Sequence, residues 1–87
     1  MHELRVFVNV FVEAPLMDEV VQALSKIDEV EELYEVTGES DIVTLVSASD
    51  IEEFRDVMEN KIMKIKGVKS TVTSVVLSAR KGPKCTT

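Results

Sequence analysis

The stretch that decides the fold is VTGESDIVTLVSASDIEEF, residues 36–54. It begins with a glycine-containing turn, continues into a run of β-branched and other apolar residues at 42–48, and ends in a helix start. Gly38 supplies the positive φ that a tight turn requires, and the β-branched run favours a strand. Ser49 and Glu52 have the spacing of a capping box, with Ser49 at the N-cap. The stretch therefore predicts a turn, a strand and a helix in succession.

Further elements are predicted on both sides of this stretch. Apolar residues alternate or recur at helical spacing along the chain, and Pro15 suits the first turn of a helix. The predicted strands cover 4–12, 30–37, 42–48 and 68–78, and the predicted helices cover about 16–27 and the segment from Ile51 to a stop at Gly67. The order is βαββαβ. Because βαβ crossovers are right-handed, both helices fall on one face of a four-stranded antiparallel sheet, which is the α+β, ferredoxin-like class.

The opposite face of this sheet has no helix to cover it. We expect it to carry Phe7, Asn9, Phe11, Thr71, Thr73, Val75 and Leu77. This mixture is too apolar for a fully solvated surface, and packing it against a second copy would bury it. The predicted dimer interface is Phe7, Asn9, Phe11, Val75 and Leu77. The alternative is a monomer with a partly apolar sheet face.

Composition limits the classes of protein and of partner. The chain has 87 residues, enough for one domain over 1–80 and a flexible tail over 81–87, and its net charge is -6. This charge disfavours direct binding to nucleic acid, although a lysine-rich run near the C-terminus leaves a phosphate contact open. Cys85 is the single cysteine, so no internal disulfide is possible and a cytoplasmic location is expected. We expect no signal peptide and no membrane span.

Catalytic machinery is sparse in this sequence. The single histidine is His2, near the start, and no internal histidine or cysteine is present to activate a nucleophile. Carboxylates occur in pairs, but at positions where a solvated role is the default. Soft metal ligands are missing from the segment Glu13-Ala14-Pro15, and no glycine-rich phosphate loop is present. The chain is therefore predicted to be no enzyme and to need no cofactor or metal.

One local feature suits a zwitterionic ligand. The turn around Gly38 offers free backbone N–H groups that can hold a carboxylate, and Asp41 can pair with an ammonium group. An amino acid carries both groups. The plainer interpretation is a hairpin turn in which Gly38 provides a positive φ and Asp41 is a local cap. The residues alone leave both interpretations open and favour the plainer one.

Three motifs in order resemble one known family. They are Thr37-Gly38-x-x-Asp41, then Asp50-Ile51-Glu52-Glu53-Phe54, and then Gly67-Val68-x-x-Thr71-x-Thr73-Ser74-Val75-Val76-Leu77. Together, from about Val6 to Leu77, they resemble the ligand-binding domain of the Lrp/AsnC (feast/famine) transcription regulators, also called the RAM domain. Regulators of this family carry a helix-turn-helix domain before it. Here a strand follows Met1 almost at once, so we expect a stand-alone form that lacks this domain.

The resemblance implies an assembly and a site. It implies a dimer with two sheets packed face to face as an αβ-barrel, and further assembly, often to octamers. Effector amino acids would bind at contacts between dimers. Carried over by position, Gly38 and Asp41 would hold the charged groups of the effector, Glu39 and Ser40 would shape the pocket, and Thr71 and Thr73 would offer hydroxyls. A full-length Lrp/AsnC regulator is a further expected partner.

Two rival interpretations remain open. An ACT domain shares the strand order and also binds amino acids, but more often pairs its sheets edge to edge. A small dimeric αβ-barrel monooxygenase or isomerase is the rival from another class. Such an enzyme would need polar residues in the barrel cavity, and Asn9 and Tyr34 are the candidates here.

Overall fold

The computed structural model describes residues 3–82 of the chain, so His2 and Cys85 lie outside the described residues. The elements are β1 (Leu4–Val12), the short 3-10 helix η1 (Ala14–Leu16), α1 (Met17–Ser25), β2 (Val30–Glu35), β3 (Ile42–Ala48), α2 (Ile51–Val57), the π-helical turn η2 (Met58–Ile62) and β4 (Val68–Val75). The predicted βαββαβ order is confirmed. Within the described part of the chain, no helix is long and apolar enough to span a membrane.

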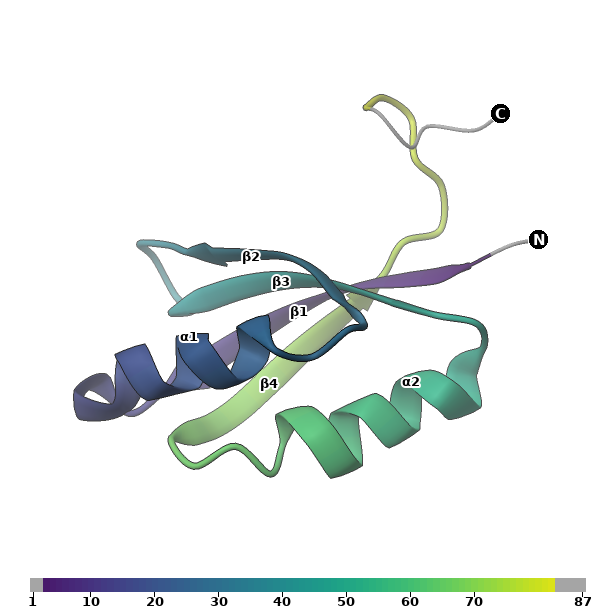
Figure 1. Ribbon diagram of the computed structural model, residues 1–87. Coiled ribbons are helices and arrows are strands. Elements are labelled where there is room, and N and C mark those ends of the chain that lie inside the picture. Colours follow the sequence, from purple (N-terminus) through teal and green to yellow (C-terminus); the bar gives the residue numbers. More distant parts are fainter. Residues whose placement is uncertain (1–2, 83–87) are drawn as a thin grey trace.

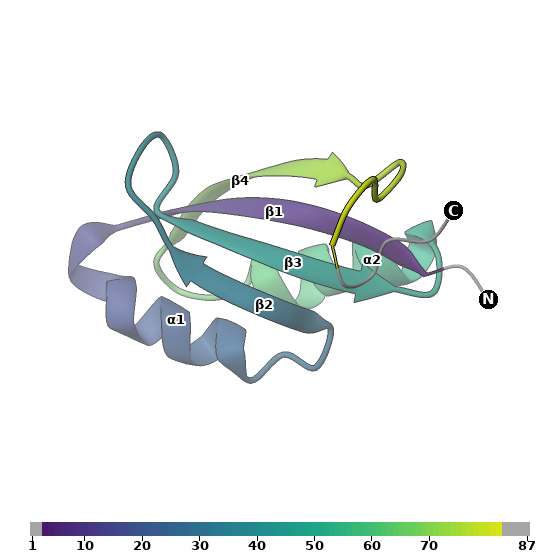
Figure 2. The same ribbon diagram turned by 90° about the horizontal axis from the view of Figure 1, so that it is seen from above.

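The four strands form one antiparallel sheet in the order β2-β3-β1-β4. Both helices lie on one face of the sheet, and the chain after β4 rises from the other side (Figure 1). The view from above shows the strands crossing over the two helices (Figure 2). The predicted ferredoxin-like architecture is therefore confirmed, and the face without helices is called the bare face below.

The hydrophobic core lies between the sheet and the helices. Alternate residues of β1 and β3 point toward the helices, as the period of a strand requires. The core includes Val6, Val8, Val10, Ile42 and Val46 from the sheet and Val20, Leu24, Phe54, Val57 and Ile62 from the helical layer. Among residues 3–82, Thr44 is the one polar residue that is fully buried, and its Oγ1 donates to the Val8 carbonyl oxygen at 3.1 Å. This bond offsets the cost of burying the hydroxyl.

The register of β4 corrects the predicted composition of the bare face. Val8 lies opposite Thr73 and Val6 opposite Val75, and residues directly opposite in an antiparallel pair share a face. The prediction that Thr71, Thr73 and Val75 lie on the bare face is therefore wrong, because all three point to the helix side. From β4 the bare face takes Ser70, Val72 and Ser74 instead, opposite Phe11, Asn9 and Phe7. Leu77 lies beyond β4 and is 96% exposed.

The start of α2 differs from the prediction by one residue. The N-cap is Asp50, whose Oδ1 accepts a hydrogen bond from the Glu53 backbone N at 2.8 Å. The Glu53 carboxylate reaches back to the backbone N of Ser49 at 3.0 Å and to its hydroxyl at 3.3 Å. A reciprocal cap therefore exists, but Asp50 and Glu53 form it instead of Ser49 and Glu52. Both pairs have the capping spacing, and Asp is as good an N-cap as Ser.

The helix after α2 contains one wide turn. The Met63 backbone N donates to the Met58 carbonyl oxygen at 2.8 Å, which is the five-residue spacing of a π-helix. Ile62 is fully buried, while its neighbour Lys61 binds Glu29 Oε1 at 2.9 Å. The helical segment then ends at Gly67, where φ is +105° and an added Cβ would lie 2.8 Å from Leu16 Cβ. Only glycine fits this close approach between the segment before β4 and the start of α1.

Candidate functional site

The predicted ligand turn closes the β2–β3 hairpin. The Val36 backbone N donates to the Asp41 carbonyl oxygen at 3.0 Å. Gly38 has φ of +117°, and no atom would lie within 4 Å of an added Cβ, so the backbone at the tip is open. Ser40 is buried and Glu39 is exposed. The turn is therefore an exposed backbone loop over residues 36–39, followed by the buried Ser40.

Asp41 joins this turn to the end of β1. Its Oδ2 accepts a hydrogen bond from the Val12 backbone N at 2.8 Å, and its own backbone N donates to the Val10 carbonyl oxygen at 3.2 Å. The β1–β4 register shifts between Phe11 and Val12, and such a shift interrupts the ladder of backbone hydrogen bonds. Asp41 acts on the other side of β1, where the pairing with β3 ends at Val10 and Ile42, and its carboxylate supplies the acceptor for the next backbone N–H on that side, that of Val12. Among the described residues its other oxygen, Oδ1, accepts no hydrogen bond.

The two threonines of the predicted site lie on the far side of β1. The strand order places β1 between β3 and β4, so two strand spacings, about 10 Å, separate Asp41 from Thr71. Both flank Val10, because Asp41 bonds to Val10 on one side and Thr71 lies opposite Val10 on the other. Thr71 Oγ1 also contacts Met63 Sδ at 3.7 Å. Within one chain, the turn and the threonines are therefore near each other but separated by β1.

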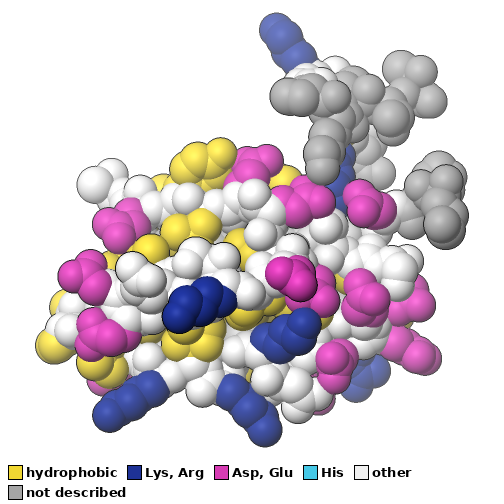
Figure 3. Space-filling view, in the orientation of Figure 1, with side chains coloured by type: hydrophobic (Ala, Val, Ile, Leu, Met, Phe, Trp, Pro, Cys, Tyr) yellow, Lys and Arg dark blue, Asp and Glu magenta, His cyan; other side chains and the backbone are white. Residues whose placement is uncertain are grey.

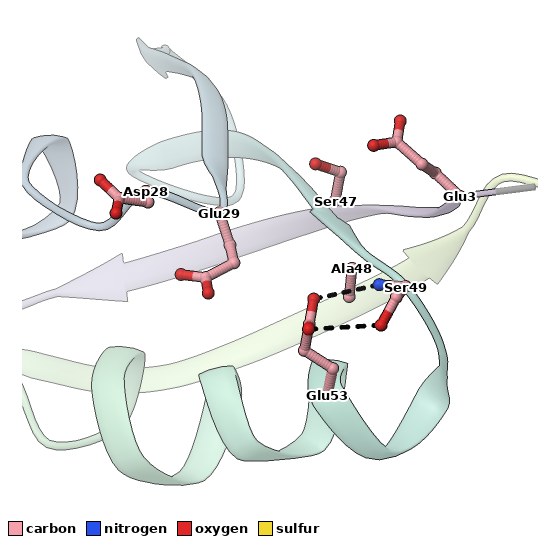
Figure 4. A pocket seen from close by; sticks show the side chains of 7 residues that line it. All are labelled: Glu3, Asp28, Glu29, Ser47, Ala48, Ser49 and Glu53. Carbon is pink, nitrogen blue, oxygen red and sulfur yellow. Dashed lines mark hydrogen bonds between the residues drawn. The ribbon is translucent and has the colours of Figure 1, made fainter. Parts of the chain in front are cut away.

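A cavity of about 350 Å³ lies at the other end of β3. Its lining residues are Glu3, Asp28, Glu29, Ser47, Ala48, Ser49 and Glu53 (Figure 4). Glu53 is engaged in the cap on Ser49 and Glu29 in the ion pair with Lys61. Within residues 3–82 no cluster of three or more His, Cys, Asp or Glu could hold a metal ion. The sequence carries the carboxylate pairs Asp28-Glu29 and Glu52-Glu53, but it gives no signal that both members of the first pair and Glu53 of the second line a common cavity.

Three ionisable groups have shifted pKa values. The hydrogen bond from Lys61 lowers the pKa of Glu29, and Glu29 in turn raises the pKa of Lys61. Tyr34 donates its hydroxyl to Glu32 Oε1 at 2.9 Å, and this bond raises the Tyr34 pKa. Each shift favours the ionisation state that the group already has at neutral pH. These three groups therefore stabilise fixed charges or a fixed hydroxyl, which is the reverse of what proton transfer requires.

The charged side chains of the helical layer are visible in the space-filling view (Figure 3). Acidic side chains are numerous there, and lysine and arginine side chains are interspersed among them. Such a mixture differs from the continuous basic stripe that phosphate binding requires. On this face, the structure therefore adds no support for direct binding to nucleic acid.

The structure combines a ferredoxin-like sheet, a bare face with exposed apolar residues and an open glycine turn. The comparison with known families makes this specific. The sequence profile described as "Lrp/AsnC ligand binding domain" matches residues 5–84. The chain belongs to this family.

Among curated proteins, an HTH-type transcriptional regulator of Pyrococcus horikoshii is 38% identical over 92% of this chain and 51% of that protein. The chain thus spans about half the length of the curated regulators it matches. A homocitrate synthase of Sulfurisphaera tokodaii is 45% identical over 67% of this chain, a match that covers 12% of the enzyme. Sequences similar to this domain therefore occur in a regulator and in a metabolic enzyme.

Solved structures agree with the fold. Escherichia coli AsnC superposes with a TM-score of 0.88 at 29% identity, covering 91% of this chain and 54% of that chain. A structure from Thermus thermophilus gives 0.84 at 30% identity, covering 91% of this chain and 99% of that one. The feast or famine regulatory protein of Mycobacterium tuberculosis, solved with L-methionine, gives 0.80 at 26% identity, covering 93% and 54%. The last protein is described as a complex with an amino acid.

Proposed function

We propose that this chain is an amino-acid-sensing, oligomerising regulatory domain that acts in transcriptional regulation. Membership of the Lrp/AsnC ligand-binding family supports the regulatory role. The mycobacterial relative with bound L-methionine supports an amino acid as effector. The observation that carries the proposal is the Asp41 carboxylate, which is held in place beside the open Gly38 backbone.

The chemistry of the turn suits a zwitterion. Asp41 Oδ1 is free to accept from an ammonium group, while the bond from the Val12 N–H to Oδ2 fixes the orientation of the carboxylate. A fixed orientation lowers the entropy cost of binding. The backbone around Gly38 would receive the effector carboxylate, and Glu39 and Ser40 would shape the pocket. Thr71 and Thr73, which lie across β1, would complete the site only from a neighbouring chain or through a long effector.

The bare face supports self-association. Phe7 is 43% exposed and Val72 54% exposed, and they surround the half-buried Phe11 and Asn9. We propose that this face packs against the same face of a second copy, which gives the two-sheet αβ-barrel, and that dimers assemble further. The same face would also accept the matching domain of a full-length Lrp/AsnC regulator.

One substitution at Asp41, with a control on α2, tests the binding site. Asp41→Asn keeps an oxygen acceptor for the Val12 N–H but removes the charge. Hydrogen bonds to charged groups contribute about 1.5–3 kcal/mol, so we expect affinity for the effector to fall roughly tenfold or more, measured by titration calorimetry with a panel of amino acids. Glu52→Gln, a charge loss on the exposed side of α2, is the matched control. Unchanged affinity in Asp41→Asn would remove the turn from the site.

A second candidate function rests on the homocitrate synthase match. This segment is 45% identical to the chain, against 38% over a longer stretch for the Pyrococcus horikoshii regulator. The identity favours a variant of the proposal in which the sensor reports to a biosynthetic enzyme and not to a DNA-binding protein. Mixing the chain with a full-length Lrp/AsnC regulator distinguishes the two. A mixed particle by light scattering supports the transcriptional role, and its absence supports the enzyme-linked one.

A further inference from the structure

On the basis of the amino-acid site proposed above, we propose that the effector has a cationic side chain and that Glu39 is a determinant of this preference. In that site Asp41 accepts from the effector ammonium group, and the backbone at Gly38 receives the carboxylate. These two contacts are common to all amino acids. The charge around the turn distinguishes one class of effector side chain from another.

The β2–β3 hairpin is an acidic element of the chain. No lysine or arginine occurs between Lys26 and Arg55. The same segment contains ten carboxylates, namely Asp28, Glu29, Glu31, Glu32, Glu35, Glu39, Asp41, Asp50, Glu52 and Glu53. The ion pair of Lys61 with Glu29 lies at the end of β2 opposite to the turn. It leaves the charge at the turn unchanged.

Three exposed carboxylates surround the position of Asp41. Glu39 belongs to the turn, Glu35 is the last residue of β2, and Glu13 follows the end of β1 to which Asp41 is bonded. Among residues 3–82, none of these three side chains makes a hydrogen bond or an ion pair. Their charges are therefore available to a ligand that binds at the turn.

Basic side chains near the turn are few. Arg5 is near the start of β1, about 23 Å at strand spacing from the end that contacts the turn. Lys69 lies in β4, two strand spacings or about 10 Å from the turn, with β1 between them. Lys66 is near Glu13, because the carbonyl oxygen of its neighbour Gly67 accepts from the Glu13 backbone N at 2.9 Å. The two lysines are outnumbered by four carboxylates, those of Glu13, Glu35, Glu39 and Asp41.

This excess of negative charge acts differently on the classes of amino acid. Glu39 directly follows Gly38, so its charge repels the effector carboxylate. An amino acid with a neutral side chain has no group that offsets this repulsion. A side chain that ends in an ammonium or guanidinium group gives the effector a net charge of +1, which the acidic surroundings attract. An acidic side chain adds a second repulsion.

The turn also offers little surface to a purely apolar side chain. Residues 37–41 read TGESD, without an aliphatic or aromatic residue. Val36 precedes them and is 38% exposed, which suits the methylene stem of a long cationic side chain. The loop projects from the sheet into solvent (Figure 2). Water and salt screen charges there, so each carboxylate contributes a preference of only a few fold.

A matched pair of ligands tests the preference. L-norleucine has the side-chain stem of L-lysine without the ε-ammonium group. By titration calorimetry we expect L-lysine to bind about fivefold tighter than L-norleucine, L-glutamate to bind most weakly, and the preference to shrink in about 0.5 M NaCl. L-norleucine binding as tightly as L-lysine would overturn the inference and leave the proposed amino-acid site standing. Failure of every amino acid of the panel to bind would remove the site itself.

A substitution in the turn tests the role of Glu39. Loss of one exposed charge pair changes affinity by about two- to fivefold, so we expect Glu39→Gln to lower the ratio of L-lysine to L-norleucine affinity by this factor. The ratio compares two ligands on the same protein, so it does not depend on the fraction that is folded. Glu52→Gln removes the same charge at the start of α2 and should keep the wild-type ratio. An equal ratio in Glu39→Gln and Glu52→Gln would contradict the assignment of Glu39.

Discussion

The two faces of the sheet contain similar apolar residues but differ in what covers them. Val8 and Phe7 are neighbours in β1 and point in opposite directions. Val8 is fully buried under the helices, while Phe7 is 43% exposed on the bare face. The bare face is itself uneven. Leu45 of β3 lies directly opposite Phe7 on this face, yet it is only 5% exposed, whereas Phe7 is 43% exposed. The comparison teaches that the bare face is an apolar centre with an open rim, a form suited to a partner surface.

The largest expected effect is on the helix side. Val8→Asp places a charge in the fully buried hydrophobic core, and uncompensated buried charges are among the most destabilising changes. We expect a loss of more than about 4 kcal/mol, a large part of the total stability of a small domain. Circular dichroism and urea unfolding would measure it. A folded Val8→Asp protein of near wild-type stability would contradict the described core.

We expect an intermediate effect from Phe7→Asp, which introduces the same charge one residue before Val8. Phe7→Asp places the charge on the bare face, where solvent reaches it in the single chain. We expect wild-type circular dichroism but a smaller particle in light scattering, because the charge would be desolvated in a stacked dimer. Glu32→Ala, a change on the same face near its edge, serves as a comparison. If Phe7→Asp keeps the wild-type mass at low protein concentration, the bare face is not the dimer surface.

The smallest effect concerns the ion pair that joins the helical layer to the loop before β2. Lys61 lowers the pKa of Glu29 from its ordinary 4.5, so the pair stabilises the fold above that value and loses this contribution as pH falls through the lowered pKa. Glu29 raises the pKa of Lys61 from its ordinary 10.5, so in alkaline solution the pair loses its contribution to stability only as the pH rises above that value. We expect Lys61→Met to be slightly less stable than the wild type at neutral pH.

The pH dependence supplies the control for this pair. The stability difference between the wild type and Lys61→Met should shrink as Glu29 becomes protonated in acid, as followed by urea unfolding at several pH values. Lys64→Met, a neighbouring lysine with no ion pair among the described residues, should show no such trend. A constant difference across the acid range would mean that Lys61 acts through packing of its aliphatic stem.

The sequence predicted the helix side well and the bare face only in part. In β1, valine alternates with larger or polar residues, so the pattern assigned each residue to its correct face. In β4, both faces carry a mixture of small hydroxyl residues and valine. A strand with so little contrast does not specify its register. The bulge adds to the difficulty, because the step from Ser70 to Val68 in β4 lies opposite the single step from Phe11 to Val12 in β1, and local spacing gives no sign of it.

The candidate site was predictable as a turn but not as a set of contacts. Gly38 and Asp41 mark a hairpin by their local chemistry. The bond between Asp41 and Val12 joins residues 29 positions apart, so only the strand pairing could place them together. The cavity lined by Glu3, Asp28, Glu29 and Glu53 likewise draws its lining from β3, α2 and three segments outside the regular elements. Its residues are distant along the chain and carry no common motif.

The wide turn at Met58–Ile62 has a consequence for how chains of this type diverge. A π-turn holds one residue more than an α-turn over a similar length of axis. Removing one residue there would convert the turn to regular α-helix without changing the loops at either end. Length differences between homologous domains should therefore occur inside this helix, between Asp50 and Gly67. A sequence alignment that places such gaps in the flanking loops would misalign Lys61, which forms the ion pair with Glu29.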